Sequence, residues 1–180
     1  YTTFEPRKEK LLQGNRWYAQ RMQLLSADFN ADGIGDFVVM VGNRIDIYSG
    51  ISPYPVLYTK TFTSTNLRMA VGDVDNDNNL DLAVIYPLAV DNAQVEVYAN
   101  GNISSEPSFF TTVPIGNSND IKIGNVKDGG KNSIITLTRQ NNSASSNIRI
   151  IDYDENTIGS LSVTATTSIT NSSAPNDNIT

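Results

Sequence analysis

Two short segments of this chain carry oxygen-bearing side chains at alternate positions. The first loop spans residues 28–36 (DFNADGIGD), and the second loop spans residues 73–81 (DVDNDNNLD). In both, positions 1, 3, 5 and 9 hold Asp or Asn, and position 7 offers a backbone carbonyl. Calcium accepts about six to eight oxygen ligands in irregular geometry, so alternate residues of a tight loop can converge on one ion. We therefore predict two Ca²⁺ sites, formed by Asp28, Asn30, Asp32, Ile34 and Asp36 and by Asp73, Asp75, Asp77, Asn79 and Asp81.

Other readings of the two loops are less consistent with the residue types. Magnesium needs a stricter octahedron, and zinc prefers His or Cys, which the chain lacks. An acidic surface turn is the alternative without a metal, because Asp, Asn and Gly are common turn residues. An EF-hand needs Glu at position 12, where this chain has Val39 and Val84. These valines lie in short β-branched runs, so the loops are expected to connect strands.

The loops belong to a repeated unit, which spans residues 20–65, 66–117 and 118–168. Each unit contains four apolar or alternating segments that predict strands. The predicted strands are 21–25, 37–41, 44–48 and 56–58 onward; then 67–71, 82–86, 94–98 and 108–112; and then 121–123, 133–137, 148–153 and 160–164. Four short strands per unit are typical of a propeller blade. The predicted fold is therefore all-β, with about three four-stranded antiparallel blades of a larger propeller.

The third unit keeps the strands and loses the metal pattern. Its third loop (125–133) has Asn125 at position 1, Lys127 at position 3, Gly129 at position 5 and Ser133 at position 9. We predict a degenerate blade without calcium, in which the Lys127 ammonium lies near the vacant site and substitutes for the cation.

The units resemble FG-GAP repeats, as found in the integrin alpha-subunit propeller and its bacterial relatives. The second unit matches their Gly-Asp-X-Asn/Asp-X-Asp-Gly-X-X-Asp core through 72–75, Asp77 and Asp81, and 85–87 lies where their Gly-Ala-Pro element falls. The first unit has Ala27 in place of the Gly, and the namesake Phe-Gly pair is absent. The resemblance covers about residues 20–165. It implies a propeller commonly of about seven blades, with calcium loops on one rim and partner binding by the opposite face and the loops between blades.

Three units are too few to close such a ring, because propellers need about four blades. We therefore expect residues 1–19 to hold the end of a preceding blade or a linker, and residues 169–180 to begin a further repeat. The remaining blades would come from the same or another chain.

The composition argues against several functional classes. Without His or Cys, the common catalytic triads are excluded, and the paired carboxylates are those claimed by the metal. We predict that the chain is not an enzyme. Seven of the 19 acidic residues lie in the two loops, and no basic patch suits nucleic acid. No apolar run is long enough for direct membrane insertion.

The loops suit millimolar calcium, which favours an extracellular or cell-surface location. Sequons at Asn102, Asn141, Asn171 and Asn178 are compatible with a glycoprotein. By the family resemblance, the first hypothesis is a calcium-stabilised propeller module that mediates adhesion or binds a protein or glycan ligand. The alternatives are a non-catalytic propeller part of a secreted carbohydrate- or lipid-active enzyme, and a structural subunit of an extracellular assembly.

Overall fold

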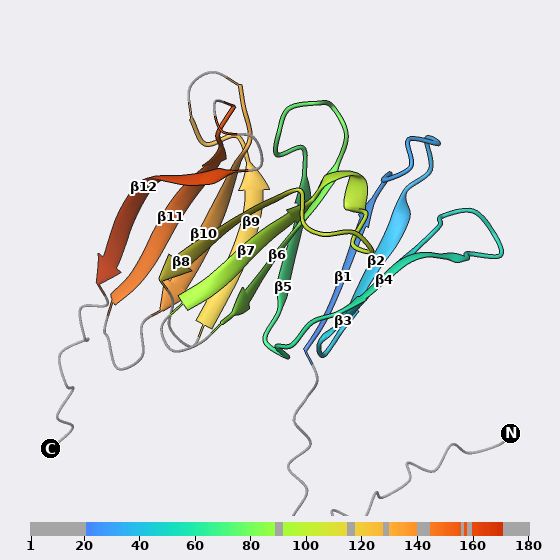
Figure 1. Cartoon of the computed structure of the whole chain (residues 1–180), viewed down its shortest axis with the longest axis horizontal. Coiled ribbons are helices and arrows are strands. Elements are labelled where there is room, and N and C mark those ends of the chain that lie inside the picture. The colour runs from blue at the N-terminus through green and yellow to red at the C-terminus, as the bar shows by residue number, and fades with distance from the viewer. Residues whose placement is uncertain are drawn as a thin grey trace, which may run out of the picture.

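A computed structural model describes residues 21–88, 92–114, 118–127, 130–139, 145–155, 157 and 160–170. These residues form twelve strands, arranged as three four-stranded antiparallel sheets, and one 3₁₀ turn (Figure 1). Within this part of the chain, no helix has the length and apolar character that a membrane span requires.

Each sheet is a meander of strands that are consecutive in the sequence. The first sheet contains β1 (Met22–Ala27), β2 (Asp36–Val41), β3 (Arg44–Tyr48) and β4 (Val56–Thr61). The middle sheet contains β5 (Arg68–Gly72), β6 (Asp81–Pro87), β7 (Asn92–Tyr98) and β8 (Phe109–Pro114), with the 3₁₀ turn η1 (Ala99–Gly101) after β7. The third sheet contains β9 (Ser118–Gly124), β10 (Ser133–Arg139), β11 (Ser145–Tyr153) and β12 (Leu161–Thr170).

The three sheets share one register around their loops. Position 9 of each loop is the residue at which the second strand begins: Asp36, Asp81 and Ser133. It pairs with the last residue of the first strand in every sheet. The following residue pairs with the third strand, as Phe37 with Tyr48 and Leu82 with Tyr98. Equivalent positions can therefore be compared residue by residue.

The middle sheet is covered on both faces (Figure 1). Side chains alternate along each strand, so one apolar row of β6 faces the first sheet and the other faces the third. Toward the first sheet lie Leu82 and Val84, which pack in one cluster with Val38. Toward the third sheet lies Ile85, which packs in a second cluster. A strand buried on both faces is expected to be continuously apolar, as β6 is.

The first strands of neighbouring sheets lie side by side. The Gln23 amide of β1 donates to the Met69 carbonyl at 2.8 Å and accepts from the Met69 amide at 2.9 Å. Gly72 of β5 lies against Ile123 of β9, and a Cβ on this glycine would come within 2.4 Å of the Ile123 Cγ2 atom. A residue without a side chain is therefore required at this contact.

The structure confirms the all-β prediction and its four-stranded antiparallel units. All twelve predicted strands are present, with boundaries that shift by a few residues. The described residues do not form a closed ring, so the propeller and its number of blades remain predictions. Residues 1–19 and 171–180 lie outside the described part of the chain, and with them the expected preceding blade and most of the expected further repeat.

Candidate metal centres

The first and second loops connect the first two strands of their sheets and have the same internal hydrogen bonds. At position 1, Asp28 accepts from the amides of Asp32 at 3.1 Å and Gly33 at 2.8 Å. Asp73 accepts from the amides of Asp77 and Asn78 at 3.2 and 3.1 Å. These bonds close each loop around the position 1 carboxylate.

The hydrogen bonds at positions 3 and 5 are also the same in the two loops. Asn30 accepts from the Asp32 amide at 3.0 Å, and Asp75 accepts from the Asp77 amide at 3.2 Å. Asp32 and Asp77 each accept from the amide at position 7, in both loops at 2.8 Å. A carboxylate offers about four acceptor sites, so these bonds leave lone pairs for a cation.

Position 9 is the buried end of each site. Asp36 is fully buried and accepts from the amides of Phe29 at 3.0 Å and Gly50 at 3.1 Å. Asp81 is equally buried and accepts from the amides of Val74 at 2.9 Å and Asn100 at 3.2 Å.

The tight curvature of both loops requires left-handed backbone at positions 4 and 6. Ala31 and Gly33 have φ of 56° and 83° in the first loop, and Asn76 and Asn78 have φ of 63° and 69° in the second. Gly and Asn tolerate this region, whereas Ala adopts it at a cost. The second loop therefore has the better adapted sequence.

Three carboxylates converge in the second loop. Asp73, Asp75 and Asp81 each offer an oxygen, and these oxygens all lie within 4.8 Å of one another. Two oxygens that share one Ca²⁺ can be separated by at most about 5.2 Å, twice the longest Ca–O distance. The donor set and its spacing therefore fit calcium. The first loop has an amide, Asn30, in place of the middle carboxylate.

The carboxylates of the second loop lie close enough to shift one another's pKa values. Burial raises the pKa of Asp81 to about 6; its bonds from Val74 and Asn100 oppose this, and Asp75 and Asp77 raise it further. Burial and the charge of Asp77 also raise the pKa of Asp75. The pKa of Asp77 is lowered by its hydrogen bonds from Asn79. A bound cation would relieve this repulsion.

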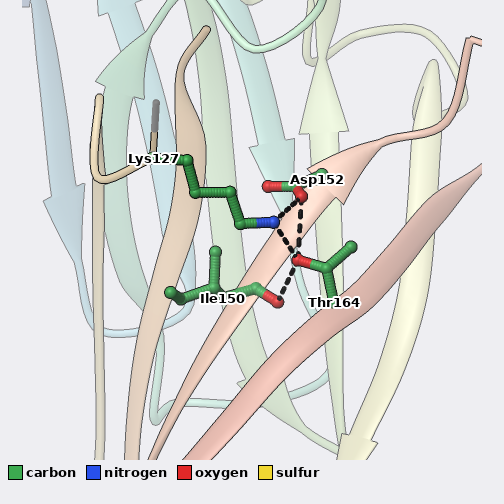
Figure 2. A network of polar contacts seen from close by, with 4 residues as sticks. All are labelled: Lys127, Ile150, Asp152 and Thr164. Atoms are coloured by element: carbon green, nitrogen blue, oxygen red, sulfur yellow. Dashed lines mark hydrogen bonds and ion pairs between the residues drawn. The ribbon is translucent and has the colours of Figure 1, made fainter. Parts of the chain in front are cut away.

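The third loop places its own cation beside a carboxylate. The Lys127 ammonium forms an ion pair with Asp152 of β11 and donates to the Thr164 hydroxyl of β12 (Figure 2). Thr164 donates to Asp152 at 2.8 Å and to the Ile150 carbonyl at 3.4 Å. We predicted that the Lys127 ammonium lies near the vacant site. In the structure it contacts β11 and β12, the last two strands of the same sheet. Gly129 lies outside the described residues.

We did not predict from the sequence that Asp152 is the partner of Lys127. Ser133 stands where the other loops have Asp36 and Asp81, while Asp152 follows Ile151, which pairs with Ile134. Asp152 is therefore opposite Ser133 on the adjacent strand. The sequence does contain a signal for this change. Compared with the first two units, the third unit has no Asp at position 9 but has an Asp near the end of its third strand.

The side chain at position 2 of the first and second loops packs against the next sheet. Phe29 is only 6% exposed, and its ring lies against Gly101, where an added Cβ would come within 2.5 Å of it. Val74 is 1% exposed and belongs to the cluster between the middle and third sheets. In addition, the Asn132 amide of the third loop donates to the Asp73 carbonyl at 2.9 Å. The loops are thus held by their neighbours as well as by their own strands.

A cavity of about 400 Å³ opens beside the second loop. Its wall is about equally polar and apolar, and its lining residues include Val74, Asn76, Lys127, Lys131, Asp152 and Tyr153. Lys131 is paired with Glu155 at this cavity.

The comparisons with known proteins found no matching family model, no matching curated protein and no matching solved structure.

Proposed function

We propose that the first and second loops each bind one Ca²⁺ ion, and that the chain is a calcium-stabilised part of an FG-GAP-like β-propeller. The repetition of the same hydrogen bonds in two loops, with carboxylates close enough to share an ion in the second, is the observation that carries this proposal. Calcium would be held by positions 1, 3, 5, 7 and 9, and its charge would offset the clustered carboxylates.

The role of the ions is structural in this proposal. Each loop joins two strands and inserts its position 2 side chain toward the next sheet, so an ion that fixes the loop also fixes the contact between sheets. At a calcium concentration of about 100 times Kd, one site adds about 2.7 kcal/mol to the free energy of unfolding.

Calorimetric titration and thermal unfolding in calcium and in chelator test the metal sites. We expect about two ions per chain and a higher Tm with calcium. Asp32→Ala and Asp77→Ala should each remove one ion, and the double variant should bind none. Asp120→Ala, an exposed carboxylate outside the loops, is the matched control and should bind both ions. Unchanged stoichiometry in both loop variants would contradict the assignment.

The module would act in adhesion, or in protein or glycan binding, outside the cell or at its surface. The polar cavity beside the second loop supports this role, because its donors and acceptors lie where a bound ion would order one wall. Binding to glycan and peptide arrays in calcium and in chelator tests it. Calcium-dependent binding that is weakened by Lys131→Ala is expected; binding that is indifferent to calcium and to this substitution would contradict the proposed surface.

A further inference from the structure

The face of the first sheet that points away from the middle sheet has apolar side chains on β1 and β2, and none of the described residues covers it. Its exposed residues lie on β1 and β2: Met22 is 77% exposed, Leu24 68%, Phe37 39% and Val41 40%. They are neighbours across the strand pair, since Met22 pairs with Val41. A contiguous apolar face of this kind marks an interface.

Because the sheets share one register, this face is equivalent to the face of the middle sheet that packs against the first sheet. Counting from position 9 of each loop, the equivalents of Met22, Leu24, Phe37 and Val41 are the residues of the middle sheet that face the first: Leu67, Met69, Leu82 and Tyr86. Leu67, Met69 and Leu82 are fully buried, and Tyr86 packs against the same cluster. The outer face of the first sheet therefore has the residue pattern of a face that is covered by another sheet.

Two charged side chains lie on this face and pair with each other. Arg44 forms an ion pair with Asp46, and Asp46 also accepts from Thr59. Its equivalent in the middle sheet is Glu96, which accepts hydrogen bonds from two tyrosines within the contact with the first sheet. A carboxylate at this register is thus compatible with a buried contact when hydroxyls satisfy it.

The outer face of the third sheet is likewise not covered by any residue that the structure describes. On the face of the third sheet that points away from the middle sheet, Leu137 is 42% exposed and Ile169 is 49% exposed. The equivalent of Leu137 in the middle sheet is Ile85, which is fully buried against the third sheet. Val126, at position 2 of the third loop, is 50% exposed, whereas Phe29 and Val74 at this position are buried against the following sheet.

The two uncovered faces are therefore the two halves of a contact that already occurs twice in the molecule. We propose that two copies of this chain associate head to tail, with the outer face of the first sheet of one copy on the far face of the third sheet of its partner. A second copy is the occupant that the structure itself shows to carry the matching face. Contacts of this kind close into rings when the rotation allows.

Ring closure rests on the proposed propeller. The described residues of two copies contribute six sheets, a number within the range of about four to eight blades in propellers. In a closed pair, each copy uses both faces, so blocking either face in every copy removes all contacts.

Light scattering after size exclusion in calcium, over a range of concentrations, tests the pairing. The wild type should have twice the monomer mass. Leu24→Glu and Leu137→Glu, which place a charge on one face each, should be monomers. Leu88→Glu, at an exposed leucine directly after β6 of the middle sheet, is the control and should remain paired. Circular dichroism establishes that each variant is folded.

Mixing the two face variants separates head-to-tail association from other modes. Leu24→Glu retains an intact third-sheet face, and Leu137→Glu retains an intact first-sheet face, so their equimolar mixture should form a pair although neither does so alone. If the wild type is monomeric at all concentrations, the proposal is wrong, and the two faces do not pair with each other. A Leu137→Glu variant that still pairs would also overturn it, because first-sheet faces would then meet each other.

The same samples separate this inference from the proposed function. Monomeric wild type that binds two calcium ions would overturn the pairing alone. A paired wild type that binds no calcium would overturn the metal sites and leave the contact between copies intact.

Discussion

The second and third loops connect the same two strands of their sheets, but the second loop is acidic and the third carries a lysine. The second loop gathers Asp73, Asp75 and Asp81, and the third replaces them with Asn125, Lys127 and Ser133. Both nevertheless connect the same two strands and have left-handed backbone at position 6, where Asn78 has φ of 69° and Gly130 has φ of 77°. The loop geometry therefore does not depend on the acidic residues, and in the third loop an internal ammonium group lies beside a carboxylate.

The third loop also has a carboxylate beside it, but at a different position from the second loop. In the third sheet, an acidic group is present at the end of β11 instead of at the start of β10. Lys127 reaches it from position 3. The calcium proposed for the second loop could be removed by a chelator, whereas the ion pair of Lys127 with Asp152 could not.

The largest expected effect comes from removing the buried carboxylate. Asp81→Ala leaves the amides of Val74 and Asn100 without their acceptor, and we expect the free energy of unfolding to fall by about 3 kcal/mol in urea titrations with chelator. Ser133→Ala, at the same position of the third loop, is the matched control and should cost about 1 kcal/mol or less. Equal losses in the two variants would contradict the distinct roles of this position.

A second prediction compares the last residues of β5 and β9. Gly72→Ala drives a Cβ into Ile123, so we expect a loss of about 2 kcal/mol in the free energy of unfolding. At Gly124 an added Cβ meets nothing within 4 Å, and Gly124→Ala should change stability little. Thermal unfolding of both variants measures the difference, and a destabilised Gly124→Ala would show that more than the close contact is involved.

Lys127→Met tests the internal cation. We expect a loss of about 1 kcal/mol or less, since the pair is partly exposed, and the loss should be the same in calcium and in chelator. A loss that appears only in calcium would mean that the third loop also binds the ion. Lys131→Met, which removes the neighbouring exposed ion pair, is the control.

The same variant gives a pH dependence. Burial raises the pKa of Asp152, but hydrogen bonds from Lys127, Ser133 and Thr164 outweigh it and leave the pKa lowered. A lowered pKa in the folded state contributes stability above the unfolded value of about 3.9, and this is lost as the pH falls through the folded-state pKa. The stability difference between wild type and Lys127→Met, measured by urea titration, should therefore shrink below about pH 4. A constant difference down to pH 2.5 would contradict the ion pair.

The smallest expected effect concerns the first loop. Ala31 adopts a left-handed conformation that Asn76 adopts in the second loop. Ala31→Gly should raise the free energy of unfolding by about 0.5 kcal/mol, because relief of strain exceeds the added chain entropy. Differential scanning calorimetry measures the shift, and a decrease in Tm would show that entropy dominates at this position.

The features predictable from the sequence were those with local periodicity. The alternation in segments such as 44–48 and 94–98 predicts strands because side chains of a half-buried strand alternate between faces. Loop spacing likewise places the candidate ligands at one site, because all of them lie within nine residues. The existence of the strands is therefore readable without tertiary information, and the two metal sites stay predictions.

The features that were not predictable depend on contacts between distant segments. Asp152 lies far from the third loop in sequence and reaches Lys127 only through pairing of β10 with β11. The requirement for Gly72 comes from Ile123 of another sheet, and burial of Phe29 comes from Gly101. No local pattern records these distances.

The Phe29 ring against Gly101 has a consequence for how the molecule opens. Fluctuation of the first loop away from its closed form would withdraw an aromatic ring from the middle sheet and expose apolar surface on both sides. Opening of one unit is therefore energetically tied to loosening of the next, and the same holds for Val74 and the third sheet. The sheets should exchange their amide hydrogens as one cooperative body, with calcium slowing exchange well beyond the residues that would touch it.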